Sequence, residues 1–148
     1  MTRSSPFTLK YRRAIVAGYG LVGRFIADEL EQAGLEVTII ETNLDTVEKQ
    51  LHLDRSCFFG DICDRKTLEE IGLLHADVLI LTVPDEQIAL KACEIAREIN
   101  PDLFIAARTN FLSRGLLAQQ LGADAVVVEE VATAQAMRKT VMDALGTA

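Results

Sequence analysis

A Gly-x-Gly-x-x-Gly turn constrains this chain more than any other feature of its sequence. The apolar run Ala14–Ala17 leads into the turn at residues 18–23, and a segment with helical periodicity follows it. Gly18 permits a tight turn, Gly20 lets the backbone lie against a pyrophosphate, and Gly23 lets the helix pack closely on the strand. The helix that begins there directs free N–H groups and the positive end of its dipole toward a bound phosphate. The segment therefore predicts a strand, a phosphate-binding turn and a helix in succession.

An acidic residue closes the next apolar run at the spacing expected of a dinucleotide-binding unit. Glu41 follows Val37–Ile40 and lies eighteen residues after Gly23. There its carboxylate can accept hydrogen bonds from the hydroxyls of an adenosine ribose. The same charge would repel a 2′-phosphate, and residues 42–44 offer no arginine to bind one. The sequence thus favours NAD(H) over NADP(H), while AMP, ADP and ATP stay open as alternatives because they share the adenosine-phosphate half.

Short apolar runs alternate with segments of helical period along the chain. Such strands, separated by helices, indicate a parallel sheet that is covered on both faces. Right-handed crossovers then predict an α/β, Rossmann-like, doubly wound sheet of six strands in the order 3-2-1-4-5-6. We expect one domain at residues 11–148, preceded by an N-terminal arm at residues 1–10. The six predicted strands are Ala14–Ala17, Val37–Ile40, Cys57–Phe59, Val78–Leu81, Phe104–Ala107 and Ala125–Val128.

Ligands of such sheets lie across the carboxyl ends of the strands, where the first and fourth strands meet. Gly60 and Asp61 follow the third strand. Asp61 is expected either to reach an adenine or to cap the helix predicted at Arg65–Ile71. Thr82 and the Val83 backbone follow the fourth strand and would lie over the ribose and phosphates.

Charged residues near these strand ends carry further expectations. Asp85 is placed to cap the next helix, and Arg108 ends the fifth strand, where it suits bidentate binding of phosphate oxygens better than mere exposure. Arg24 opposes the dipole of the first helix, so a phosphate or an acid is expected near it. Glu129 and Glu130 are either a cation or interface site or acids at the start of the last helix. The predicted nucleotide-binding residues are Gly18, Tyr19, Gly20, Leu21, Val22, Gly23, Glu41, Thr42, Gly60, Asp61, Thr82, Val83 and Arg108.

Composition excludes several classes of function. A net charge of −7 and a pI near 4.8 argue against binding DNA or RNA, which requires a basic surface. No apolar run is long enough to span a membrane, and residues 1–10 lack the apolar centre of a signal peptide. Three cysteines without C-x-x-C spacing and only two histidines predict neither a disulfide nor a metal site. We expect a reduced, cytoplasmic setting.

Catalytic motifs are missing from the sequence. Neither Tyr11 nor Tyr19 has a lysine four residues later, and neither His52 nor His75 ends a predicted strand. No nucleophile elbow or P-loop motif is present. The sequence therefore favours a binding module over an enzyme. An NAD-dependent oxidoreductase, or its cofactor-binding half, is the alternative, and a scaffold that has lost its ligand is a third interpretation that the intact glycines and Glu41 disfavour.

An ordered set of short segments resembles one family. The segments are Val16–Gly23, Val37–Thr42, Gly60-Asp61, Ala76-Asp77, Leu81–Asp85, Asn100-Pro101, Ile105–Arg108, Leu121–Asp124 and Val126–Glu130. Together they resemble the regulator-of-potassium-conductance domain, also called the KTN or TrkA-N domain, and are most similar to the cytosolic domains of Kef-type cation/proton antiporters. The resemblance covers the chain from Tyr11 onward.

The resemblance implies a sensor of NAD(H) or adenine nucleotides that regulates a membrane potassium channel, transporter or antiporter. It also implies a homodimer formed through the crossover after the sixth strand, at the inner face of the membrane, either as a free-standing subunit or as part of a longer transporter. Two departures stand out: Leu21-Val22 occupy the place of a phosphate-binding arginine in many relatives, and Glu129 replaces a common proline. These departures weaken the case for a triphosphate ligand and for a cation at Glu130.

The last predicted helix, from about Val131 to Leu145, bears on assembly. Ala134, Met137 and Val141 form an apolar stripe along it that continues to Leu145. Packing on the chain's own sheet is the ordinary interpretation of such a stripe, whereas the resemblance favours packing on a second copy. We expect dimerisation.

Overall fold

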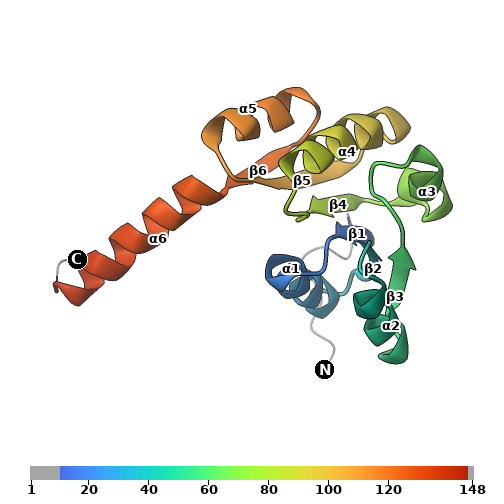
Figure 1. Ribbon diagram of the computed structural model, residues 1–148, viewed down its shortest axis with the longest axis horizontal. Coiled ribbons are helices and arrows are strands. Elements are labelled where there is room, and N and C mark those ends of the chain that lie inside the picture. The colour runs from blue at the N-terminus through green and yellow to red at the C-terminus, as the bar shows by residue number, and fades with distance from the viewer. Residues whose placement is uncertain (1–10, 147–148) are drawn as a thin grey trace.

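The computed structural model describes residues 11–146 and contains a parallel sheet of six strands in the order β3-β2-β1-β4-β5-β6 (Figure 1). This confirms the predicted fold class and strand order. The N-terminal arm predicted at residues 1–10 lies outside the described residues. The strands are β1 (Arg13–Ala17), β2 (Glu36–Glu41), β3 (Ser56–Phe59), β4 (Val78–Leu81), β5 (Phe104–Thr109) and β6 (Ala125–Val128). The helices are α1 (Leu21–Gln32), α2 (Leu44–His52), α3 (Arg65–Glu70), the 3₁₀ helix η1 (Leu73–His75), α4 (Glu86–Ile99), α5 (Leu112–Gln120) and α6 (Glu129–Ala144).

The larger part of the core lies between the sheet and the helices α4 and α5. These helices pack on β5 and β6, while α1 and α2 pack on β1, β2 and β3 on the opposite face (Figure 1). Side chains alternate between the faces along each strand, so Ile15 faces the larger core cluster and Ala14 a smaller one. Ile15, Leu79 and Ile105 are at most 3% exposed. Burial of β1 on both faces, and of β4 mainly on the face that α4 covers, holds the carboxyl ends of these two central strands in a fixed position.

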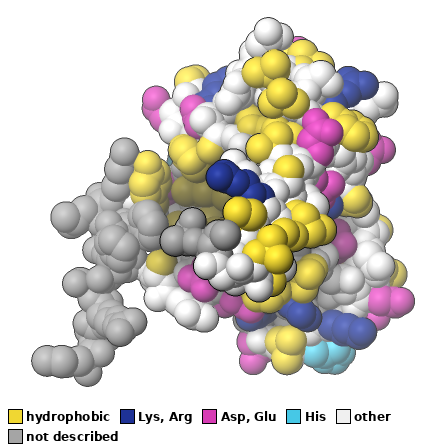
Figure 2. All heavy atoms as spheres, turned by 90° about the vertical axis from the view of Figure 1, so that its left-hand side faces the viewer, with side chains coloured by type: hydrophobic (Ala, Val, Ile, Leu, Met, Phe, Trp, Pro, Cys, Tyr) yellow, Lys and Arg dark blue, Asp and Glu magenta, His cyan; other side chains and the backbone are white. Residues whose placement is uncertain are grey.

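Helix α6 projects from the end of β6 away from the rest of the domain (Figure 1). Every residue from Val131 to Gly146 is exposed, including Met137, at 60%, and Leu145, at 70%. In the view toward this side of the molecule, hydrophobic side chains gather around the projecting helix (Figure 2). The interpretation that α6 packs on its own sheet is therefore wrong. The helix also begins at Glu129, two residues earlier than predicted.

Because α6 projects outward, no helix of residues 11–146 covers the sheet face beside α1 over β4, β5 and β6. A hollow of about 530 Å³ lies there. We call it the apolar hollow, since most of the side chains that line it are aliphatic: Val22, Ile26, Ile80, Ala106 and Val127 are among them. Among residues 11–146, no helix is both long enough and apolar enough to cross a bilayer.

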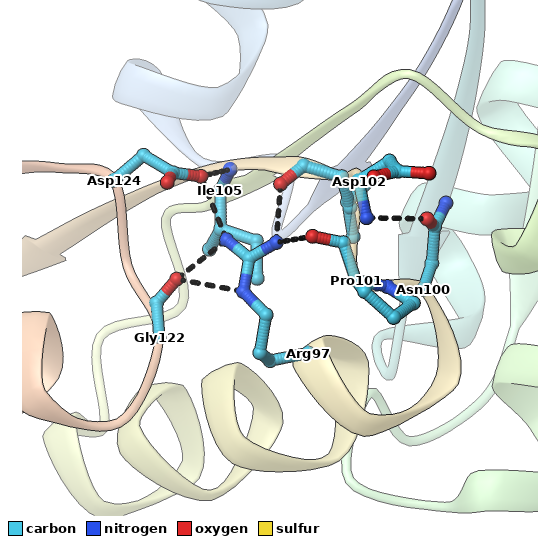
Figure 3. Close-up of polar contacts among 8 residues, drawn as sticks. Arg97, Asn100, Pro101, Asp102, Ile105, Gly122 and Asp124 are labelled. Carbon is cyan, nitrogen blue, oxygen red and sulfur yellow. Dashed lines mark hydrogen bonds and ion pairs between the residues drawn. The ribbon is translucent and has the colours of Figure 1, made fainter.

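A network of polar contacts fastens the amino-terminal edge of the sheet (Figure 3). The Arg97 guanidinium donates to the carbonyl oxygens of Gly122, Pro101 and Leu103 at 2.7–3.2 Å and pairs with Asp124 at 2.7 Å. Asp124 in turn accepts a hydrogen bond from the Ile105 amide at 2.9 Å. One arginine thus holds the end of α4 and the chain segments that enter β5 and β6 together.

Nearby side chains extend this network to β1 and β4. Asn100, which is 7% exposed, donates to the carbonyl oxygens of Leu73 and Ala76 at 3.0 Å. Asp77 accepts hydrogen bonds from the amides of Arg12 and Arg13 at 2.8 and 3.0 Å. The polar segments that precede β4, β5 and β6 are therefore structural, and they lie at the end of the sheet opposite to the predicted binding site.

Replacing Arg97 with lysine should lower the free energy of unfolding by about 2–3 kcal/mol, because one ammonium group cannot reach all the carbonyl oxygens that the guanidinium now satisfies. Urea denaturation followed by circular dichroism measures the change. Arg138→Lys on the exposed helix α6 is the matched control and should change the midpoint little. Equal midpoints for the two variants would show that the network contributes nothing to stability.

Candidate functional site

The glycine turn connects β1 to α1 through a closely packed backbone. Gly18 has a φ of +94°, a conformation that favours glycine, and its amide donates to the Ile40 carbonyl at 3.0 Å. The Thr82 hydroxyl lies within 3.0 Å of the carbonyl oxygens of Ala17 and Gly18. A Cβ atom on Gly23 would come within 1.9 Å of the Gly18 carbonyl oxygen. The turn can take this shape only with glycine at the first and third glycine positions of the motif, Gly18 and Gly23.

The second glycine faces open space. A Cβ atom on Gly20 would have no neighbour within 4 Å. Gly20 is the N-cap of α1, and no side chain caps this helix end or places an acid in its first turn. In contrast, Asn43 caps α2 and Asp85 caps α4 through their side chains. The N-terminus of α1 is therefore left as a positive end with N–H groups available to an anion.

Acidic side chains lie at the carboxyl ends of β2 and β3. Glu41 Oε2 accepts a hydrogen bond from the Thr42 amide at 3.0 Å. Asp61 Oδ1 accepts one from the Cys63 amide at 2.8 Å, within its own turn. The N-cap of α3 is Asp64 rather than Asp61, so the interpretation of Asp61 as a helix cap is wrong.

Residues after β4 and β5 complete the edge of the site. Asp85 accepts hydrogen bonds from the Gln87 and Ile88 amides, which confirms it as the cap of α4. Thr82 is only 7% exposed, and its hydroxyl contacts the backbone carbonyl oxygens of the glycine turn. Arg108 Nε pairs with Glu129 Oε1 at 2.6 Å. The carboxylate at the first residue of α6 thus occupies the arginine that the sequence assigns to a phosphate.

These elements enclose a cleft of about 510 Å³ at the carboxyl ends of β1, β2, β3 and β4. Ten of the predicted site residues line it: Gly18, Tyr19, Gly20, Glu41, Thr42, Gly60, Asp61, Thr82, Val83 and Arg108. The other three lie elsewhere: Leu21 lines a separate hollow between α1 and α2, Val22 lines the apolar hollow, and Gly23 is buried under the turn. Their assigned roles in binding stay predictions.

Sequence reasoning missed several residues that line the cleft. Ile62, Pro84 and Ile88 add an apolar wall, and Asn43 stands beside Glu41. Pro84 follows the predicted strand Val78–Leu81 and belongs to the segment Leu81–Asp85, so its position at the strand end could have been predicted from the sequence. Ile62 and Ile88 face the cleft because of the turn geometry and the rotation of α4, which apolar periodicity alone does not fix.

The cleft presents binding groups without an evident reactive group. Neither histidine lines it. All three cysteines are free thiols, and burial raises the pKa of each, that of Cys93 to about 11. Within the described residues, no group of three or more His, Cys, Asp or Glu side chains is arranged to hold a metal ion. The arrangement suits recognition of a polar, phosphate-bearing ligand by backbone amides and a carboxylate.

The chain matches one protein family and is similar to a potassium-efflux protein. A family model described as the TrkA-N domain matches residues 14–129. The chain is similar to the glutathione-regulated potassium-efflux system protein KefC of Klebsiella pneumoniae (strain 342), with 29% identity over 134 residues that make up 90% of this chain and 22% of KefC. It therefore spans about a fifth of the length of this curated relative.

Two solved structures share the fold. The TrkA-N domain of the inner membrane protein ybaL from Escherichia coli aligns with a TM-score of 0.84 and 27% identity, covering 88% of this chain and 96% of that one. The Shewanella denitrificans Kef CTD in its AMP-bound form aligns with a TM-score of 0.80 and 24% identity, covering 93% of this chain and 83% of that one.

Substituting alanine at Gly20 and at Gly23 should separate the two roles of the turn. Gly23→Ala should lower the free energy of unfolding by about 2–4 kcal/mol, because the new Cβ atom forces the backbone of the turn to move. Gly20→Ala, whose Cβ atom faces open space, should lower it less, by about 0.5–1 kcal/mol, because alanine is a poorer N-cap than glycine. Thermal and urea denaturation measure both. If Gly23→Ala proved as stable as the parent, the close packing described above would be wrong.

Proposed function

Because the chain belongs to the TrkA-N domain family, we propose that it is a regulatory module that binds an adenine nucleotide and controls a potassium transport protein. The observation that carries the proposal is the cleft, where the uncapped N-terminus of α1 and the Glu41 carboxylate stand on the same opening. A phosphate and a ribose of one nucleotide require these two groups side by side. KefC, the potassium-efflux relative, and the AMP-bound Kef CTD support the same conclusion.

The groups in the cleft suggest how a nucleotide would lie. The first-turn N–H groups of α1 would bind its phosphates, and Glu41 would accept hydrogen bonds from its ribose. Ile62, Pro84 and Ile88 offer an apolar wall for the adenine ring. All of these contacts involve the adenosine-phosphate half, so AMP, ADP, ATP and NAD(H) are all candidate ligands of the same cleft.

A route from the nucleotide to α6 runs through Arg108. This side chain lines both the cleft and the apolar hollow, and it pairs with Glu129, the first residue of α6. A phosphate that recruits Arg108 would compete with Glu129 for the guanidinium. The position of α6 would then depend on whether the cleft is occupied, which is what a regulatory module requires.

We further propose that α6 packs on a second copy of the chain. An isolated helix of this length is marginally stable in water, so a projecting helix gains most from a partner. Met137, Val141 and Leu145 expose an apolar stripe, while no helix within the described residues covers the apolar hollow. In a homodimer, the apolar stripe of α6 from one copy would cover the apolar hollow of the other.

The regulated protein is proposed from the relatives alone. KefC is named as a potassium-efflux system protein, so a membrane potassium transporter or channel is the expected partner, and the chain would act at the inner face of that membrane. The alternative, an oxidoreductase, lacks a supporting observation, because neither histidine lines the cleft and burial raises the pKa of every thiol.

Glu41→Ala should weaken AMP and NAD(H) binding by about 10- to 150-fold, because the ribose hydroxyls lose a charged acceptor worth about 1.5–3 kcal/mol. Titration calorimetry on the 148-residue chain measures the affinity. Glu48→Ala removes the same charge from α2 at a residue that does not line the cleft, and it should bind like the parent. Unchanged AMP affinity in Glu41→Ala would contradict the ribose contact.

Light scattering should report twice the 16.2 kDa mass of one chain for the parent protein. Met137→Asp should shift the particle to the mass of one chain, because it places a charge in the apolar stripe of α6. Ala136→Asp adds the same charge on the opposite side of the helix and should leave the mass unchanged. A parent protein that stays at the mass of one chain at high concentration would exclude the dimer.

A further inference from the structure

A second hollow, of about 330 Å³, lies between α1 and α2 on the far side of the glycine turn from the apolar wall of the cleft. We call it the α1–α2 hollow. Tyr19, Gly20, Arg24, Thr46, Lys49 and Gln50 line it. It shares Tyr19 and Gly20 with the nucleotide cleft, so the two openings adjoin at the glycine turn.

The chemistry of this hollow differs from that of the cleft. Its polar side chains all carry hydrogen-bond donors: a guanidinium, an ammonium, two hydroxyls and an amide. No carboxylate lines it, whereas Glu41, Asp61 and Asp85 line the cleft. A surface built of donors and two cations suits an oxyanion.

Gln50 has an unsatisfied group at this place. Its side chain lines the hollow although the residue is only 8% exposed, and Oε1 has no hydrogen-bond partner among the described residues. A buried amide without its partners costs about 1–3 kcal/mol. The NH₂ group of the same amide is not enclosed in this way, so Gln50 can donate it to a ligand in the hollow.

The neighbouring ion pair keeps Tyr19 available as a donor. Arg55 donates to the Tyr19 hydroxyl oxygen, which leaves the hydroxyl hydrogen free to point elsewhere. Arg55 also pairs with Asp28 at 3.0 Å and with Glu31 at 3.5 Å, so this one cation partly offsets the two nearby acids. Burial raises the pKa of Tyr19, which keeps the phenol protonated at neutral pH.

Arg24 and Lys49 are the two charged residues that line the hollow, and no acidic residue lines it with them. Arg24 lies in the first turn of α1, where a cation opposes the helix dipole, and no acid shares that turn. An anion in the α1–α2 hollow would interact favourably with both Arg24 and the helix end. The unfavourable position of this arginine is thus offset once the hollow is occupied.

We propose that the α1–α2 hollow is a phosphate subsite, held by Lys49, Arg24 and the Gln50 amide. The phosphate has two possible sources of the same chemistry: a 2′-phosphate carried by the nucleotide in the adjoining cleft, or free inorganic phosphate. The first source rests on the proposed function and must overcome the Glu41 carboxylate. The second is independent of any nucleotide.

Titration calorimetry with three ligands tests the subsite: inorganic phosphate, AMP and adenosine 2′,5′-bisphosphate. The protein is the 148-residue chain, together with Lys49→Gln and with Lys66→Gln, a matched control on α3 that lies outside the hollow. Lys49→Gln should lower the affinity for inorganic phosphate by about tenfold or more, or should reduce by the same factor the difference in affinity between the bisphosphate and AMP. Lys66→Gln should bind all three like the parent.

Each outcome decides the matter. Phosphate binding that depends on Lys49 supports the free-anion source, even if AMP fails to bind and the proposed nucleotide function is lost. A bisphosphate that binds at least tenfold more tightly than AMP, through Lys49, supports the nucleotide-borne source. If phosphate does not bind and the bisphosphate gains nothing over AMP, or if Lys49→Gln and Lys66→Gln behave alike, the subsite does not exist. Arg24→Gln, at an exposed side chain, provides a second variant that should behave like Lys49→Gln toward inorganic phosphate.

Discussion

The close approach of the Gly23 α-carbon to the Gly18 carbonyl oxygen is the contact on which both binding surfaces depend. There is no room for a side chain between them, since a Cβ atom would lie 1.9 Å from that oxygen. The contact sets where α1 begins and how closely it follows β1. The uncapped end of the helix lies where the cleft at the strand ends adjoins the α1–α2 hollow.

The two ends of the sheet have different roles. At the amino-terminal edge, Arg97, Asn100 and Asp124 satisfy backbone groups and hold the strands in register. At the carboxyl edge, the side chains leave the N-terminus of α1 without a cap and keep carboxylates near open space. The hydrogen bonds at the amino-terminal edge stabilise the fold, whereas at the carboxyl edge the N–H groups of α1 have no side-chain cap. Several segments that carry the family resemblance therefore maintain the scaffold rather than contact a ligand.

The sequence predicts the backbone of this domain better than the partners of its charged side chains. The six strands and their order follow from apolar runs and crossover handedness, which are local properties and a general rule. The cap at Asp85 also follows from local chemistry. In contrast, the pairing of Arg108 with Glu129 joins residues from different elements, and only the course of the chain after β6 brings them together.

Helix α6 shows a second limit of the same kind. Its apolar stripe was visible in the sequence, but the stripe does not say which surface it covers. The structure excludes packing of the stripe on the chain's own sheet, because every residue from Val131 onward in the described part of the chain is exposed. The α1–α2 hollow lay beyond sequence reasoning for another reason: Arg24 and Lys49 are separated along the chain, and their approach depends on how two helices sit on the sheet.

Under the proposed function, the Arg108–Glu129 ion pair would be exchanged for a contact between Arg108 and a phosphate, and a switch requires that the two states be close in energy. If a phosphate draws Arg108 into the cleft, Glu129 loses its partner but remains in the first turn of α6, where the helix dipole stabilises a carboxylate by about 0.3–1 kcal/mol. The exchange therefore leaves no buried charge without compensation, since both groups are partly exposed. By linkage, any surface that fixes α6 must change the affinity of the cleft by the factor with which the nucleotide changes that docking. If the chain binds a nucleotide and dimerises as proposed, nucleotide affinity and dimerisation are therefore coupled, and each must be measured at a stated level of the other.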